Sequence, residues 1–210
     1  MEQQKSIFAN AQTQKIVEPC ASCGVRCCNR FAVPLTGFDI VRMMKHSKKE
    51  TPQECKQFCE LADAKNIESA PHSLVFIFNQ GVLEERLLTL VRKKNMYCVF
   101  SKHSNGCEIW GAHPMVCRAY PFSLDEQKQI KYVKNFVCPR KWSEQEYNKE
   151  SVQEIVEQQN NEIEQYNKII REWNARHCKE KNEIDFFEFL IAKTKIVMTK
   201  KRKFEEIELR

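Results

Sequence analysis

The stretch CASCGVRCC, residues 20–28, places four cysteines within nine residues. Four thiolates this close repel one another, whereas a bound cation converts the repulsion into coordination and deprotonates the thiols. Cys20 and Cys23 have the C-x2-C spacing that lets two sulfurs reach one metal, and Gly24 permits a tight turn after them. Cys27 and Cys28 are neighbours that point in different directions, so they most easily serve different metal atoms. The stretch predicts metal binding, with a reactive dithiol or an oxidised pair as the alternative.

A second group of cysteines follows at Cys98, Cys107, Cys117 and Cys138. Residues 107–122 read CEIWGAHPMVCRAYPF, and Pro139 follows the last cysteine. The two groups together resemble the CxxCxxCC cysteine-cluster family of zinc- or iron-chelating proteins (YkgJ-like). In that family an N-terminal cysteine cluster is followed by C-x-F and then by C-x-I-Y-x-x-R-P-x-x-C-R-x-Y-P-F. The resemblance covers about residues 18–140.

This chain departs from the family pattern in three places. The first cluster is C-x2-C-x3-C-C, one residue longer than the family's spacing; Trp110 stands where the family has tyrosine; and His113 takes the place of the usual arginine. The cysteines that match the family are all present. The resemblance implies that they are the metal ligands and that Arg118 donates to a metal-bound sulfur. The implied ligands are Cys20, Cys23, Cys27, Cys28, Cys98, Cys107, Cys117 and Cys138.

Eight thiolates are enough for two four-sulfur sites, whether these hold Zn2+ or [4Fe-4S] clusters. The first 140 residues contain 20 Lys and Arg against 13 Asp and Glu, and this charge of +7 would offset the negative charge of such sites. The aromatic residues around the cysteines and the Cys138-Pro139 ending favour an iron–sulfur cluster. C-x2-C knuckles are equally typical of zinc, so both cofactors stay open.

Composition argues against several other classes of protein. Glycine occurs 5 times in 210 residues and never as G-x-G-x-x-G, and the segment from Gly106 to Gly111 lacks the lysine of a phosphate-binding loop. The first 15 residues contain no apolar segment typical of a signal peptide, and no apolar run approaches the ~20 residues of a membrane span. We therefore expect a cytoplasmic protein without membrane contact, in which cysteines stay reduced and bind metal.

The chain changes character near residue 140. Ten of its 11 cysteines and all seven prolines lie in the first 140 residues, while the last 70 are rich in Glu, Gln, Asn and Lys. We expect a cysteine-rich metal-binding domain over residues 1–140 and a helical C-terminal extension over 141–210. The predicted fold class is α+β and helix-rich, with a few short strands followed by a C-terminal antiparallel helix pair.

Local patterns predict the elements. Thr36 caps one helix, and Thr51 begins another through the capping box Thr-Pro-Gln-Glu, with an apolar face that extends to Ala62. Strands are expected at residues 73–78, 82–91, 96–100 and 130–137, with a turn at 79–81. Helices are expected from Ser143 or Ser151 to His177 and from 184 to 198. The first of these carries an apolar seam that consists of Val156, Ile163, Tyr166, Ile170 and Trp173.

Several residues have simpler interpretations than metal binding. Cys55 and Cys59 lie with Phe58 on the apolar face of the second predicted helix, which favours core packing over ligation. His113 could replace a thiolate as a nitrogen ligand, but capping or a hydrogen bond beside Pro114 is the preferred prediction. The basic run at residues 200–203 indicates a solvated helix end.

The first functional hypothesis is a metal-binding protein whose C-terminal helices form a lid or a docking surface for a protein partner. A protein lysine N-methyltransferase-like enzyme is the alternative, and it rests only on the flagellin lysine N-methylase relatives that the family resemblance implies. A zinc-dependent nucleic-acid or protein interaction module is a further alternative, but a net charge of +6 with interspersed acids makes nucleic acid a weak candidate. The sequence identifies no catalytic acid, base or nucleophile.

Overall fold

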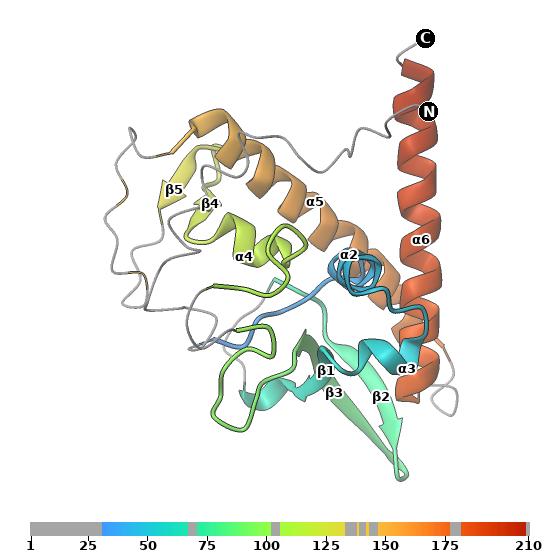
Figure 1. Ribbon diagram of the computed structural model, residues 1–210. Helices are drawn as coiled ribbons and strands as arrows, with labels where there is room; N and C mark the ends of the chain where they lie inside the picture. Colours follow the sequence, from blue (N-terminus) through green and yellow to red (C-terminus); the bar gives the residue numbers. More distant parts are fainter. Residues whose placement is uncertain are drawn as a thin grey trace. The chain divides into compact units, whose positions relative to one another are not determined.

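The computed structural model describes residues 31–66, 71–101, 106–132, 138, 142, 147–176 and 182–208, with side chains up to residue 200 (Figure 1). Helices and short antiparallel strands are both present, and two long helices end the chain, so the predicted α+β fold class is confirmed. Contacts divide the backbone into two compact units. The larger contains residues 32–91 and 161–210, and residues 92–160 belong to the other. The predicted domain boundary at residue 140, which rests on cysteine content, stays a prediction.

A three-stranded antiparallel sheet lies in the unit formed by residues 32–91 and 161–210. Its strands are β1 (Cys59–Asp63), β2 (Val75–Asn79) and β3 (Val82–Leu90), with β3 in the middle (Figure 1). Asn79 pairs with Val82, and the two residues between them, Gln80 and Gly81, have φ values of 48° and 86°. Two positive φ values in a two-residue loop match the twist of a hairpin. The strands and turn predicted between residues 73 and 91 are therefore confirmed.

The predicted cap at Thr36 and the predicted capping box at Thr51 are present at the starts of helices α2 (Gly37–Ser47) and α3 (Pro52–Cys55), and Thr36 also forms a capping box. However, α3 ends after four residues, and the chain turns through the 3-10 segment η2 (Ala64–Asn66) only after forming β1. The prediction of a helical face reaching Ala62 was wrong because β1 pairs with β3 along its whole length. Ladder hydrogen bonds to a distant strand here outweigh the local helical pattern.

Three further sequence predictions need correction. Residues 96–100 do not form a strand; Met96 has a φ of 67° and Cys98 makes only an isolated bridge to Arg92. Helix α5 (Lys149–Asn174) is capped by Asn148, whose side chain accepts a hydrogen bond from Ser151 N at 2.8 Å, and not by a serine. Helix α6 (Glu183–Glu208) begins where expected and runs ten residues beyond the predicted end at residue 198.

Side chains of α5 bind the open edge of strand β2 in place of a fourth strand. The side-chain amide of Asn174 accepts from Phe76 N at 3.0 Å and donates to Leu74 O at 2.8 Å. Trp173 Nε1 donates to Phe76 O at 2.9 Å. Asn167 repeats the two-bond pattern with Ser73 N and Pro71 O. These bonds satisfy main-chain groups that an edge strand would otherwise leave unpaired.

The predicted apolar seam of α5 is buried, and it meets α6 at the connected ends of the two helices. Tyr166, Ile170 and Trp173 are fully buried. The Trp173 indole contacts the rings of Phe186 and Phe189, with centroids 5.4 and 5.6 Å apart. The two predicted C-terminal helices and the burial of the α5 seam are thus confirmed, while the antiparallel pairing of the helices stays a prediction.

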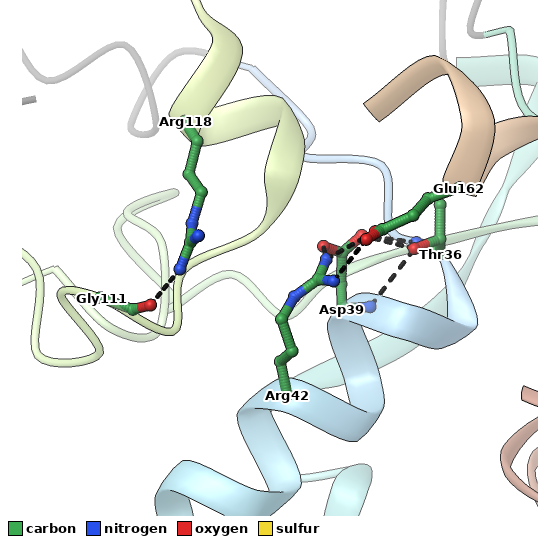
Figure 2. Close-up of polar contacts among 6 residues, drawn as sticks. All are labelled: Thr36, Asp39, Arg42, Gly111, Arg118 and Glu162. Carbon is green, nitrogen blue, oxygen red and sulfur yellow. Dashed lines mark hydrogen bonds and ion pairs between the residues drawn. The ribbon is translucent and has the colours of Figure 1, made fainter. Parts of the chain in front are cut away.

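A buried ion network connects α2 with α5 (Figure 2). Asp39 Oδ2 accepts from Thr36 N and Oγ1, and Asp39 Oδ1 lies 2.5 Å from Arg42 Nη2. The guanidinium of Arg42 also donates to both carboxylate oxygens of Glu162 at 2.7 Å. Burial opposes the charge of Arg42, but the two carboxylates outweigh it and raise its pKa. Thr36, the N-cap of α2, is thereby connected to α5 through Asp39 and Arg42. Arg42 and its partner Glu162 are 120 positions apart in the sequence.

Gly37 allows a close crossing of α2 and α6. A Cβ added at Gly37 would overlap Thr194 Oγ1 and lie 2.9 Å from Leu190 Cδ1. Gly37→Ala should lower the free energy of unfolding by ~1–3 kcal/mol, the usual cost of overpacking, although alanine is the better helix former. Urea denaturation measures this change. The double variant Gly37→Ala/Thr194→Ala should recover part of the loss, and full stability in the single variant would contradict the close crossing.

His72 should make the larger unit sensitive to acid. Its ring is buried edge-on against Tyr166, with centroids 5.8 Å apart, and Nδ1 has no hydrogen-bond partner among the described residues. Burial lowers the pKa of His72 to about 4, although the nearby Asp39 carboxylate opposes the shift. The neutral form is therefore the folded form, and stability is lost as pH falls from 6.5 toward 4.

We expect the free energy of unfolding to fall by about 2 kcal/mol between pH 7 and pH 5 through His72 alone. Denaturation of wild type and of His72→Gln at both pH values isolates this contribution, because the other titrating groups are common to the two proteins. His46→Gln, at an exposed position, is the control and should keep the wild-type pH dependence. Equal pH dependence in wild type and His72→Gln would show that the imidazole is not buried in the neutral form.

The other unit is built from short elements around a small core. Strands β4 (Phe122–Leu124) and β5 (Ile130–Tyr132) form a hairpin beside helix α4 (Met115–Ala119) (Figure 1). Met115, Ala119 and Phe122 pack against one face of the first half of α5. This core confirms a strand at the start of the predicted segment 130–137; residues 133–137 lie outside the described part of the chain.

Candidate metal centre

Cys98 and Cys107 each begin a turn, and Ser101 joins the two turns. The carbonyl of Cys98 accepts from Ser101 N at 3.0 Å, and the carbonyl of Cys107 accepts from Trp110 N at 3.3 Å. Ser101 also forms an antiparallel bridge with Cys107. Cys98 is buried and Cys107 is partly exposed. Main-chain contacts therefore hold these two predicted ligands on adjacent turns.

Cys117 lies in the middle of α4, and a loop over residues 108–114 connects it with Cys107. The Arg118 guanidinium donates to the main-chain oxygen of Gly111 (Figure 2). Gly111 has a φ of 91°, a backbone conformation that favours glycine. Arg118 thus fastens the loop to the helix that carries Cys117. Its predicted hydrogen bond to a metal-bound sulfur stays a prediction.

His113 is a hydrogen-bond acceptor within the same loop. Its Nδ1 accepts from Gly111 N at 3.2 Å, and its ring stacks on the Trp110 indole with centroids 4.8 Å apart and an interplanar angle of 11°. The imidazole is buried. The predicted hydrogen bond of His113 is confirmed, because Nδ1 accepts from a main-chain donor.

Cys138 contacts Tyr132 at the end of strand β5. Burial, followed by the electrostatic effect of Cys138 and a side-chain hydrogen bond with it, raises the pKa of Tyr132. The phenol and the Cys138 side chain are therefore hydrogen-bond partners. Polar side chains that bond to a metal ligand orient that ligand. Sequence analysis did not predict this pair, because no spacing rule links the two residues.

The first cysteine cluster, Cys20, Cys23, Cys27 and Cys28, lies outside the described residues. Among the residues that the structure does describe, no three Cys, His, Asp or Glu side chains form a group able to hold a metal ion. The described cysteines are nevertheless thiols, which are suitable donors for Zn2+ and for iron–sulfur clusters. A complete four-sulfur site in this unit would need ligands from elsewhere in the chain.

Cys55 and Cys59 pack in the core of the larger unit, as predicted. Both side chains are fully buried, and each thiol donates to a main-chain oxygen, Cys55 Sγ to Pro52 O at 2.8 Å and Cys59 Sγ to Cys55 O at 3.1 Å. Burial, with a smaller contribution from Cys55, raises the pKa of the Cys59 thiol. Neutral thiols in an apolar core are poor metal ligands.

Comparison with known families assigns the chain to one family. The model of the CxxCxxCC family, described as a "putative zinc- or iron-chelating domain", matches residues 19–179. This range contains every cysteine predicted as a ligand and extends through helix α5. The chain belongs to the CxxCxxCC family, and this membership supports metal binding.

Neither the curated proteins nor the solved structures provide a match to the chain. Among the described helices, none has both the length and the apolar character that crossing a membrane requires.

Proposed function

We propose that this protein binds iron, as a [4Fe-4S] cluster, or Zn2+ through eight cysteines drawn from two stretches of the chain. The first stretch supplies Cys20, Cys23, Cys27 and Cys28, and the second supplies Cys98, Cys107, Cys117 and Cys138. The observation that carries the proposal is the family match over residues 19–179, which spans both stretches. Eight thiolates would bind two metal centres of four sulfurs each.

The arrangement of the second stretch supports the proposal. Cys98 and Cys107 are joined through Ser101, and Cys107 and Cys117 are joined through the loop fastened by Arg118. Three thiols are thus carried by one continuous set of main-chain and side-chain contacts. Because the described residues alone do not form a complete metal site, the missing ligands are assigned to the first stretch.

Metal and sulfide analysis of protein purified without oxygen tests this function. Iron with equimolar acid-labile sulfide and broad absorption near the blue end of the visible range would identify an iron–sulfur centre. Zinc without sulfide or colour would identify zinc sites. Less than one equivalent of any metal per chain would contradict the proposal.

The proposed compartment and partner follow from the same chemistry. Thiolate ligands need a reducing environment, and the cytoplasm provides one.

A protein partner would dock on the C-terminal helices. Beyond Thr194, which is fully buried, α6 exposes Lys195, Ile196 and Lys200, and Ile196 is 52% exposed. An exposed isoleucine between lysines is suited to a partner with an apolar and acidic surface.

A further inference from the structure

Two side chains bind the main chain of the loop between Cys107 and Cys117, and both bind it at Gly111. Its main chain turns at Gly111, whose N–H donates to His113 Nδ1 and whose carbonyl accepts from Arg118. The main-chain N–H and the carbonyl of Gly111 are therefore both hydrogen-bonded, the N–H to His113 and the carbonyl to Arg118. Gly111 has a φ of 91°, which glycine adopts readily and other residues rarely do, and these two bonds select that conformation in the loop.

Contacts run without a break from one predicted ligand to the other. The Cys107 carbonyl accepts from Trp110 N, and the Trp110 ring stacks on His113. His113 then accepts from Gly111, and Gly111 accepts from Arg118. The α4 turn that contains Cys117 is itself closed by its hydrogen bond to Pro114 O at 2.9 Å.

We infer that His113 is a positioning residue for the metal centre: it sets the spacing of Cys107 and Cys117 by accepting the Gly111 N–H, and it does not bind metal itself. This inference rests on the proposed function. A neutral imidazole that accepts at Nδ1 carries its proton on Nε2, so the ring presents no lone pair to a cation. The aromatic ring stacks on Trp110, while the acceptor nitrogen fixes the main chain.

Two substitutions distinguish the role of the His113 acceptor nitrogen from the role of its aromatic ring. His113→Phe keeps an aromatic ring against Trp110 but has no acceptor. His113→Asn loses the ring, but its side-chain oxygen takes the place of Nδ1. If the acceptor positions the ligands, His113→Phe should release metal faster than wild type by about 10- to 100-fold, the usual effect of losing a residue that orients a ligand. His113→Asn should stay close to wild type.

The probe is Zn2+ added to the full-length apoprotein without oxygen, and the measurement is its rate of transfer to a chromogenic chelator. Gly111→Ala tests the same loop from the donor side. Nothing lies within 4 Å of the added Cβ, so its effect comes from the strained φ and not from a clash. It should also speed release, including in the case that His113→Phe does not fold.

The outcomes separate the two proposals. Wild-type protein that takes up no Zn2+ would contradict both this inference and zinc binding. Wild-type protein that binds Zn2+ while His113→Phe and Gly111→Ala release it at the wild-type rate would contradict this inference alone. Fast release from His113→Asn together with slow release from His113→Phe would assign the role to ring stacking and overturn the acceptor role. Substitution with Co2+ gives a second readout, since an altered Cys107–Cys117 spacing changes the visible bands of a thiolate-bound cobalt.

Discussion

Removal of the metal should unfold the unit that contains residues 98–119 and leave the sheet unit folded. Thiolate-bound zinc contributes on the order of 10 kcal/mol to the folding of small metal-binding modules. That is comparable to the whole stability of an ordinary domain. The described apolar core of this unit is small and consists of Met115, Ala119, Phe122 and three residues of α5, so we expect it to depend on the metal.

Hydrogen exchange before and after anaerobic chelation measures this difference. Amides over residues 98–101 and 106–119 should lose protection, while those of β1 and β3 should keep it. The sheet strands serve as an internal control, because β1 and β3 pair with each other and contain none of the predicted ligands. Unchanged protection around Cys107 and Cys117, after metal analysis confirms removal, would contradict a structural role for the metal.

Arg42→Met should destabilise the sheet unit by ~3–5 kcal/mol, because it leaves buried carboxylates without their cation. The Asp39 and Glu162 side chains are only 3% and 9% exposed, and Arg42 contacts both. Arg42→Lys should lose part of that stability, since an ammonium cannot donate to both oxygens of Glu162 in the fork geometry that Arg42 uses. Urea denaturation gives the free energy of unfolding for each variant.

Arg86→Met is the matched control, because its ion pair with Glu84 is more than a quarter exposed on both sides. An exposed pair is worth ~0–1 kcal/mol, so this variant should stay near wild type. Arg42→Met/Glu162→Leu should recover stability relative to Arg42→Met, since Asp39 keeps its bonds to Thr36. A loss below 1 kcal/mol in Arg42→Met would contradict the buried network.

Local sequence signals predicted the parts of the fold that depend on near neighbours. The caps at Thr36 and Thr51 join residues three positions apart, and both are present. The β2–β3 hairpin is set by a two-residue turn, and the α5 seam by helical spacing. Each of these features is complete within a window of about twenty residues or fewer.

The features that the sequence did not predict depend on distant partners. Helix α3 stops at Cys55 because Cys59–Asp63 pairs with a strand about 25 residues later. The amide bonds of Asn167 and Asn174 to the edge of β2 and the ion pair of Arg42 with Glu162 join residues about 100 positions apart. No periodicity marks these polar residues, since on an isolated helix they resemble solvated side chains.

The candidate site likewise has features that the sequence predicted and features that it did not. Cysteine spacing indicated metal binding, which family membership supports, and the resemblance implied a set of eight ligands that stays a prediction. The loop geometry around Gly111 and the contact of Tyr132 with Cys138 come only from the three-dimensional structure. These contacts decide how the thiols are held, which spacing alone does not specify.

X-ray absorption at the metal edge of anaerobically purified protein measures most directly whether sulfurs from both cysteine stretches share a metal centre. We expect a first shell of four sulfurs in the wild type. Cys23→Ser and Cys117→Ser, one from each stretch, should each replace sulfur in that shell with a lighter ligand or lose the metal. A shell dominated by oxygen and nitrogen, or one that neither substitution changes, would contradict the shared thiolate site.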